Sequence, residues 1–175
     1  MIGKPLRIYI SEDLWKQSKK DIIDGIIKKI NTAKEILMMD KEISAGIYVC
    51  ALEELGKLLL LKNSKIVNGK YVIKYRNEFI NHQVKLWKAY NYLQSKNSYE
   101  CIILYDEEIY STSDSYTWKK FLSASERVLG IFYSDFSISK KNNKQYEIMK
   151  FPKIDRNNLK DAINELENVI VNFEK

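Results

Sequence analysis

The chain is poor in the residues that interrupt regular secondary structure, with 2 prolines and 6 glycines among its 175 residues. This scarcity excludes a turn-rich β-sandwich and favours long, uninterrupted helices. Hydrophobic residues make up 45% of the sequence, close to the average for globular proteins, which excludes extensive disorder. A chain of this length can bury a core, and we expect a single domain spanning residues 1–175.

Cysteine and histidine are also scarce, with 2 cysteines and 1 histidine. Cys50 and Cys101 lie in apolar stretches without metal-ligand spacing. We expect two buried free thiols in a reducing compartment, with a disulfide between them as the alternative. A single histidine does not supply a zinc site, and the sequence contains neither a glycine-rich phosphate loop nor a nucleophile elbow. The sequence therefore predicts neither a metal nor a cofactor.

The sequence contains no uninterrupted apolar run of membrane length and no apolar core of a signal peptide near its start. The most apolar stretch, residues 43–61, is broken by Glu53, Glu54 and Lys57, which predicts a buried helix of a soluble protein. We therefore expect a cytoplasmic protein that makes no membrane contact. The net charge of +6 allows attraction to nucleic acid, although scattered lysines also suit an ordinary solvated surface.

Apolar residues at three- and four-residue steps predict the helices. Ser11 begins the first helix, with acidic residues in its first turn, and Asp40 caps the second. Asn68-Gly69 marks a turn, after which a third helix is predicted over residues 75–96. The apolar stripes predicted for the first two helices are Leu14, Ser18, Ile22, Ile26, Ile30, Ala33 and Leu37, and then Ile43, Ile47, Cys50, Ala51, Glu54, Leu55, Leu58 and Leu61.

A fourth helix is predicted over residues 118–132, and a last one after Pro152 and Asp155. Alternating apolar residues between positions 136 and 148 predict a small β-hairpin before this last helix. Residues 101–105 fit either a short strand or a buried apolar plug. The expected fold is mainly all-α, a four- or five-helix bundle with this hairpin.

Charged residues interrupt the second predicted helix at Glu53-Glu54-Leu55-Gly56-Lys57. Helical periodicity puts Glu54 on the buried stripe, where a carboxylate needs a cation or several hydrogen-bond donors. Glu53 lies to one side and is predicted to pair with Lys57. Gly56 costs about 1 kcal/mol relative to alanine inside a helix, which predicts the close approach of another helix.

Groups that could satisfy Glu54 occur on the third and fourth predicted helices. His82 lies on the apolar stripe of the third helix with Lys85 one turn later, and Arg127 adjoins the apolar Val128. Such a network can fix the register of helices. Alternatively, His82 can act as a general acid or base while an arginine stabilises a phosphorane-like transition state. Both interpretations remain open at this point.

Three segments together resemble the AbiV family of abortive infection proteins. They are residues 51–57, 79–86 and 126–135, with sequences ALEELGK, FINHQVKL and ERVLGIFYSD. The resemblance runs in order over residues 22–173. It implies a helical HEPN-type fold, a homodimer, and a role in antiphage defence that arrests growth or translation, with a phage or host protein as the trigger. Many HEPN domains are metal-independent ribonucleases with an arginine shortly before a histidine, a spacing that Arg76 and His82 match.

The resemblance leads to one main expectation, a dimeric ribonuclease that cleaves RNA when infection is sensed. In it His82 transfers protons, Arg76 or Arg127 binds the scissile phosphate, and Glu54 and Lys85 orient these groups. The 2′-hydroxyl of the RNA is the nucleophile, so no metal is needed. The alternative is a non-catalytic module that binds a phage or host protein through an apolar and aromatic surface.

Overall fold

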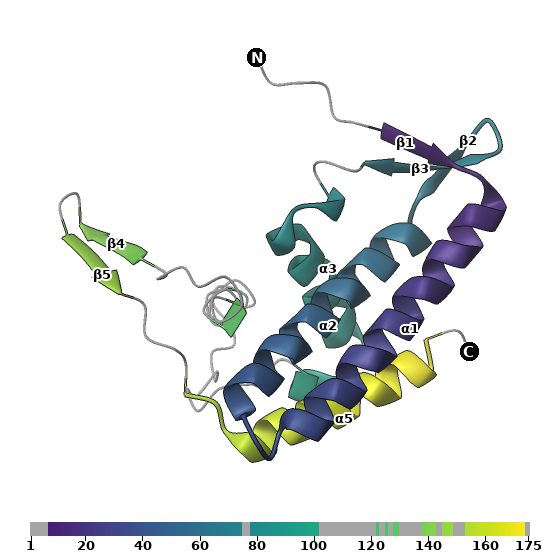
Figure 1. Ribbon diagram of the computed structural model, residues 1–175. Helices are drawn as coiled ribbons and strands as arrows, with labels where there is room; N and C mark the ends of the chain where they lie inside the picture. The colour runs from purple at the N-terminus through teal and green to yellow at the C-terminus, as the bar shows by residue number, and fades with distance from the viewer. Residues whose placement is uncertain are drawn as a thin grey trace.

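The protein is mainly helical and carries a small antiparallel sheet, as its computed structural model shows (Figure 1). The structure describes residues 7–74, 78–101, 138–142, 145–148 and 153–173, together with the helical residues 122, 125, 128 and 129. The long helices are α1 (Glu12–Ile36), α2 (Lys41–Lys62), α3 (His82–Ser95) and α5 (Arg156–Val171). The expected mainly-α class is confirmed.

Three of these helices begin at capping residues that the sequence signals locally. Ser11, Asp40 and Asp155 are the N-caps of α1, α2 and α5. Each side-chain oxygen accepts the backbone N–H three residues later, at 3.3, 2.9 and 2.9 Å respectively. Such a bond satisfies one of the amide groups that the first helical turn leaves without a partner. The predicted starts of these helices are confirmed.

Helix α2 is the central element of the fold. It packs against α1 on one side and α3 on another, while α5 packs on α1 (Figure 1). Buried residues occur all round α2 rather than along one stripe, which is typical of a helix enclosed by its neighbours. Ile43, assigned to the buried stripe, is instead exposed, and so is Leu14 on α1. Among the described residues, no helix combines the length and apolarity needed to cross a membrane.

A three-stranded antiparallel sheet, which the sequence prediction missed, covers one end of the helices. Its strands are β1 (Arg7–Ile10), β2 (Lys65–Val67) and β3 (Lys70–Lys74), in the order β1-β3-β2. Between β2 and β3, the predicted turn at Asn68 and Gly69 is confirmed, with φ angles of 51° and 72°. Two consecutive positive φ angles are typical of a type I′ hairpin turn.

The third helix is shorter than predicted. It begins at His82 rather than near residue 75, because the chain up to Lys74 belongs to strand β3. Residues 78 and 79, shortly before it, have π-helical geometry.

Trp15 fastens the sheet to the helices. Its ring stacks on Tyr71 of β3 with 4.5 Å between ring centroids. Its indole N–H donates to the Leu61 carbonyl at 2.9 Å, in the last turn of α2, and to Ser64 Oγ at 3.1 Å, just after this helix. One side chain of α1 therefore fixes the sheet against the carboxyl end of the central helix.

A second β-hairpin precedes the last helix, as predicted. Strands β4 (Ile138–Asn142) and β5 (Gln145–Ile148) pair antiparallel, with Ile138 opposite Ile148. In the region of the predicted fourth helix, the described residues are helical, and Val128 and Leu129 among them are buried. Of the segment 101–105, only Cys101 lies in the described part, where it ends a 3₁₀ turn, η2 (Tyr99–Cys101).

Both cysteines are free thiols, which excludes the disulfide alternative. Cys101 is fully buried, whereas Cys50 on α2 is only half-buried. Burial raises the pKa of the Cys101 thiol to about 12. Burial, and secondarily the nearby Glu53 carboxylate, also raises the pKa of Cys50.

These thiols are expected to differ in reactivity, because only the thiolate is alkylated. In the folded protein at mildly alkaline pH, Cys101 should resist iodoacetamide while Cys50 reacts slowly. Both should react at similar rates in denaturant. Mass spectrometry of tryptic peptides from a time course measures the two rates, and native alkylation of Cys101 as fast as that of Cys50 would contradict the assigned burial.

Candidate functional site

Glu53 on α2 joins the central helix to the start of α3. Its Oε1 lies 2.6 Å from His82 Nδ1, and its Oε2 accepts a hydrogen bond from Lys85 Nζ at 3.0 Å. His82 is the first residue of α3, and Lys85 follows one turn later. We call Glu53, His82 and Lys85 the Glu53 cluster. It uses both oxygens of one carboxylate to bind two residues of a neighbouring helix.

The first turn of α3 explains why an acid from another helix is needed there. Asn81 caps the helix by accepting the N–H groups of Gln83 and Val84 at 3.0 and 3.3 Å. The macrodipole favours negative charge at this end, but the first turn of α3 contains no acidic residue. Glu53 supplies the negative charge from α2.

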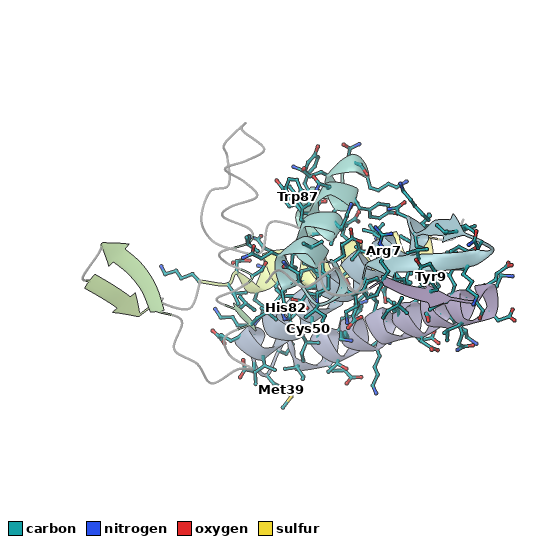
Figure 2. All side chains as sticks on the ribbon, turned by 90° about the horizontal axis from the view of Figure 1, so that it is seen from above. Arg7, Tyr9, Met39, Cys50, His82 and Trp87 are labelled. Carbon is teal, nitrogen blue, oxygen red and sulfur yellow. The ribbon has the colours of Figure 1, made fainter. Side chains whose placement is uncertain are left out.

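The three side chains of the cluster differ sharply in exposure. Lys85 is 5% exposed and Glu53 10%, whereas His82 is 53% exposed. A buried ammonium group is costly without an anionic partner, and Glu53 is that partner. Because His82, labelled in Figure 2, reaches solvent while Glu53 and Lys85 are buried, the cluster has a buried part and an accessible outer edge.

The contact with Glu53 determines which nitrogen of His82 carries the proton. An ionised carboxylate can only accept hydrogen bonds, so Nδ1 must be the donor. In the neutral ring the lone pair is then on Nε2, which forms no hydrogen bond with any described residue. An imidazole oriented in this way by a carboxylate can take up and return a proton at Nε2.

Gly56 allows the two helices to approach closely enough for these contacts. A Cβ atom at this position would lie 2.6 Å from the carbonyl carbon and 2.7 Å from the Cα of Lys85. Both are backbone atoms of α3, so no side-chain movement could relieve the clash. The close approach of another helix, predicted from this glycine, is confirmed.

Replacing Gly56 by alanine should lower the free energy of unfolding by about 1–3 kcal/mol, the usual cost of overpacking. Gly25→Ala on α1 is the matched control, because its Cβ would meet only the flexible Lys29 Nζ at 3.9 Å. That control should raise stability by up to about 1 kcal/mol through helix propensity. Urea denaturation measures both variants, and equal shifts in the same direction would show that the contact with Lys85 is unimportant.

The prediction that Glu54 is the buried acid of this helix is wrong. Its carboxylate is 20% exposed and pairs with Lys57 at 3.0 Å and with Lys29 of α1 at 3.5 Å. Glu53, predicted as the surface partner of Lys57, is instead the buried acid. The error arose because α2 is enclosed on more than one side, so the stripe through Glu54 marks the face toward α1.

A signal for Glu53 was nevertheless present in the sequence. Gly56 lies three residues after Glu53, which places both on one face of the helix. A glycine that marks a close helix contact therefore also marks the side chains that meet the neighbouring helix.

The structure brings together two of the five predicted site residues. His82 and Lys85 meet in the Glu53 cluster, while Glu54 lies on the neighbouring face toward α1. Arg76 and Arg127, predicted to bind phosphate, lie outside the described residues.

The described residues contain no group of three histidine, cysteine or acidic side chains placed to hold a metal ion. Comparisons with protein-family models, with curated proteins and with solved structures found no match for the chain. Function is therefore inferred from the geometry of the Glu53 cluster.

Proposed function

We propose that the protein is an antiphage abortive-infection effector, with a HEPN-type fold, that cleaves RNA without a metal ion. One observation carries the catalytic part, the 2.6 Å contact between Glu53 and a half-exposed His82. This contact orients the imidazole while about half of the side chain stays accessible, and a proton-transfer group must reach its substrate. Two of the three segments that resemble AbiV proteins, residues 51–57 and 79–86, contain all three cluster residues.

In the proposed reaction, Nε2 of His82 accepts the proton of a ribose 2′-hydroxyl. The 2′-oxygen forms a bond to the adjacent phosphorus as the bond from phosphorus to the 5′-oxygen breaks. Protonated His82, or the same residue of a second copy in a homodimer, returns a proton to that 5′-oxygen. The products carry a 2′,3′-cyclic phosphate and a 5′-hydroxyl. Arg76 or Arg127 is assigned to the charge that develops on the phosphate.

Glu53 and Lys85 are positioning residues in this scheme. Glu53 fixes the proton on Nδ1 and stabilises the imidazolium that forms during the reaction. Lys85 binds the second oxygen of the carboxylate and so restricts the rotation of Glu53. Glu53 thus takes the orienting role first expected of Glu54.

The purified protein tests this proposal in buffer containing EDTA. Labelled RNA, including RNA extracted from infected cells, should be cut to products with cyclic phosphate ends. Expression of the protein should also reduce phage plaque formation. Absence of cleavage from every RNA tested, or cleavage only after a divalent metal is added, would contradict the proposal.

A second candidate is a non-catalytic module that binds a phage or host protein. Exposed apolar side chains favour it, among them Met38 and Met39 in the α1–α2 connection and Ile43 in the first turn of α2. Methionine-rich surfaces suit adaptable protein contacts. Under this alternative, phage protection would be lost in a Met38→Glu/Met39→Glu variant and kept in His82→Gln. If the protein is a ribonuclease, His82→Gln should instead lose phage protection.

A further inference from the structure

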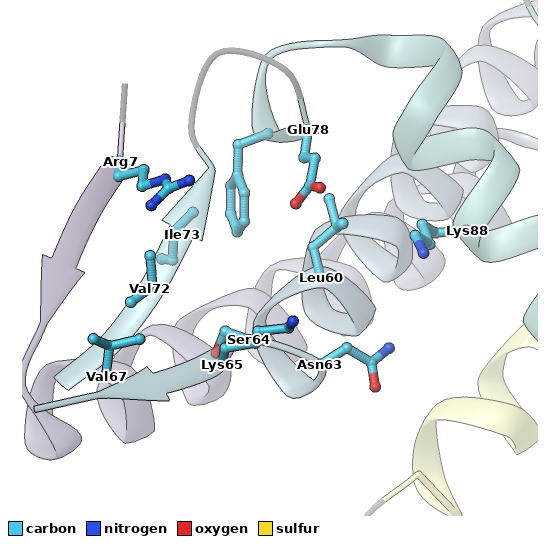
Figure 3. Close-up of a pocket in the computed structure, with 11 residues that line it drawn as sticks. Arg7, Leu60, Asn63, Ser64, Lys65, Val67, Val72, Ile73, Glu78 and Lys88 are labelled. Atoms are coloured by element: carbon cyan, nitrogen blue, oxygen red, sulfur yellow. The ribbon is translucent and has the colours of Figure 1, made fainter. Parts of the chain in front are cut away.

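A pocket of about 470 Å³ lies between the three-stranded sheet and helices α2 and α3 (Figure 3), and none of its lining residues belongs to the Glu53 cluster. Three cationic side chains line it from three different elements, Arg7 of β1, Lys65 of β2 and Lys88 of α3. Its apolar wall includes Leu60, Val72 and Phe79. We call this the sheet pocket. Its size is within the range of ordinary ligand sites.

The positive charge of the sheet pocket is only partly offset within the part of the chain that the structure describes, because three cationic side chains share the lining with one acid. Arg7, Lys65 and Lys88 form no ion pair with any described residue. Glu78 is the one acid among the lining residues, and it already makes an interaction of its own. Like charges that converge on a concave surface repel one another, and a bound anion relieves this repulsion.

The sheet continues this basic surface beyond the pocket. Side chains alternate between the faces of a strand, so Arg7 and the exposed Tyr9 share one face of β1. Val72 of β3 lies between Tyr9 of β1 and Lys65 of β2, its paired residues, so these side chains share one face of the sheet. Lys70, two residues before Val72, lies on this face as well. A row of cations with an aromatic ring suits a charged chain better than a single small anion.

These features match the way proteins bind single-stranded nucleic acid. Cations track the phosphates while bases stack on aromatic rings, and duplex RNA is instead read by its shape. Phe79 in the pocket and Tyr9 on the sheet supply rings. Phe79 also lies three residues before the exposed His82 in the sequence, and Lys88 belongs to the same helix α3 as His82.

We infer that the sheet pocket and the adjoining sheet face bind a single-stranded RNA segment and present it to His82. The inference rests on the proposed ribonuclease function for its biological meaning. Binding can nevertheless be measured without cleavage, so the two can fail separately.

The test measures fluorescence anisotropy of a labelled oligouridine of about ten nucleotides. The protein carries His82→Gln to prevent cleavage. Adding Arg7→Gln, Lys65→Gln and Lys88→Gln should weaken binding at least about tenfold. The slope of log affinity against log salt should flatten by about 2, since each phosphate contact on a single strand contributes about 0.7. Phe79→Leu should also weaken binding, but with the salt slope unchanged.

A matched control removes three exposed lysines elsewhere, through Lys20→Gln, Lys153→Gln and Lys160→Gln. Affinity should then change less than about twofold, although the net charge falls equally. An equal loss in this control would overturn the inference, and so would tighter binding of duplex RNA or full competition by uridine monophosphate. Binding at the sheet pocket without cleavage by the unmodified protein would refute the ribonuclease and leave the inference standing.

Discussion

Replacing His82 by glutamine should lower the rate of RNA cleavage by about 10²- to 10⁴-fold, the usual contribution of a positioned general acid or base. Glutamine keeps a polar side chain beside Glu53 but cannot take up the proton of a 2′-hydroxyl. The bond between Glu53 and the buried Lys85 remains. Because His82 is half-exposed, stability should change by less than about 1 kcal/mol.

Initial rates with labelled RNA, beside urea denaturation curves, separate loss of chemistry from loss of folding. Lys57→Gln is the control on α2, because it removes the pair with Glu54 without touching the Glu53 cluster. It should retain nearly full activity and phage protection. A folded His82→Gln protein that cleaves RNA at the original rate would show that this histidine is not the proton-transfer group.

Local signals in the sequence predicted the helices well, and non-local pairing limited the rest. The caps Ser11, Asp40 and Asp155 act within one helical turn, so each can be read from a few residues. Strand β1 forms only because β3, more than sixty positions later, lies beside it. Nothing within residues 7–10 encodes that partner. The Asn68-Gly69 turn is a signal for a β-hairpin. It predicts a strand directly after Gly69, and the third helix must then begin later than residue 75.

The candidate site was predictable on α3 but not on α2. The spacing of His82 and Lys85 puts both on nearly one face of any helix, so their convergence followed from periodicity. The choice between Glu53 and Glu54 requires knowing which face of α2 meets which neighbour. A helix that is apolar nearly all round does not show this through its hydrophobic pattern. Only Gly56 carried the information, because its missing side chain marks the contact with α3.

Replacing Glu53 by leucine should lower the free energy of unfolding by about 3–5 kcal/mol, the cost of leaving a buried charge without its partner. Lys85 Nζ has Glu53 as its hydrogen-bond partner, and its side chain is 5% exposed. Urea denaturation measures the loss. A Glu53→Leu protein as stable as the original would show that Lys85 does not depend on this carboxylate.

The double variant Glu53→Leu/Lys85→Met separates the structural role of the carboxylate from its role in orienting His82. Two apolar side chains of similar size can replace a buried ion pair at little cost, so stability should recover to within about 1–2 kcal/mol of the original. Cleavage should not recover with it, because His82 Nδ1 still lacks its acceptor. Loss of an orienting carboxylate can cost a histidine-dependent enzyme up to about 10⁴-fold in rate. A double variant that is both stable and fully active would mean that Glu53 only holds the helices together, and the exposed imidazole would then need another orienting group.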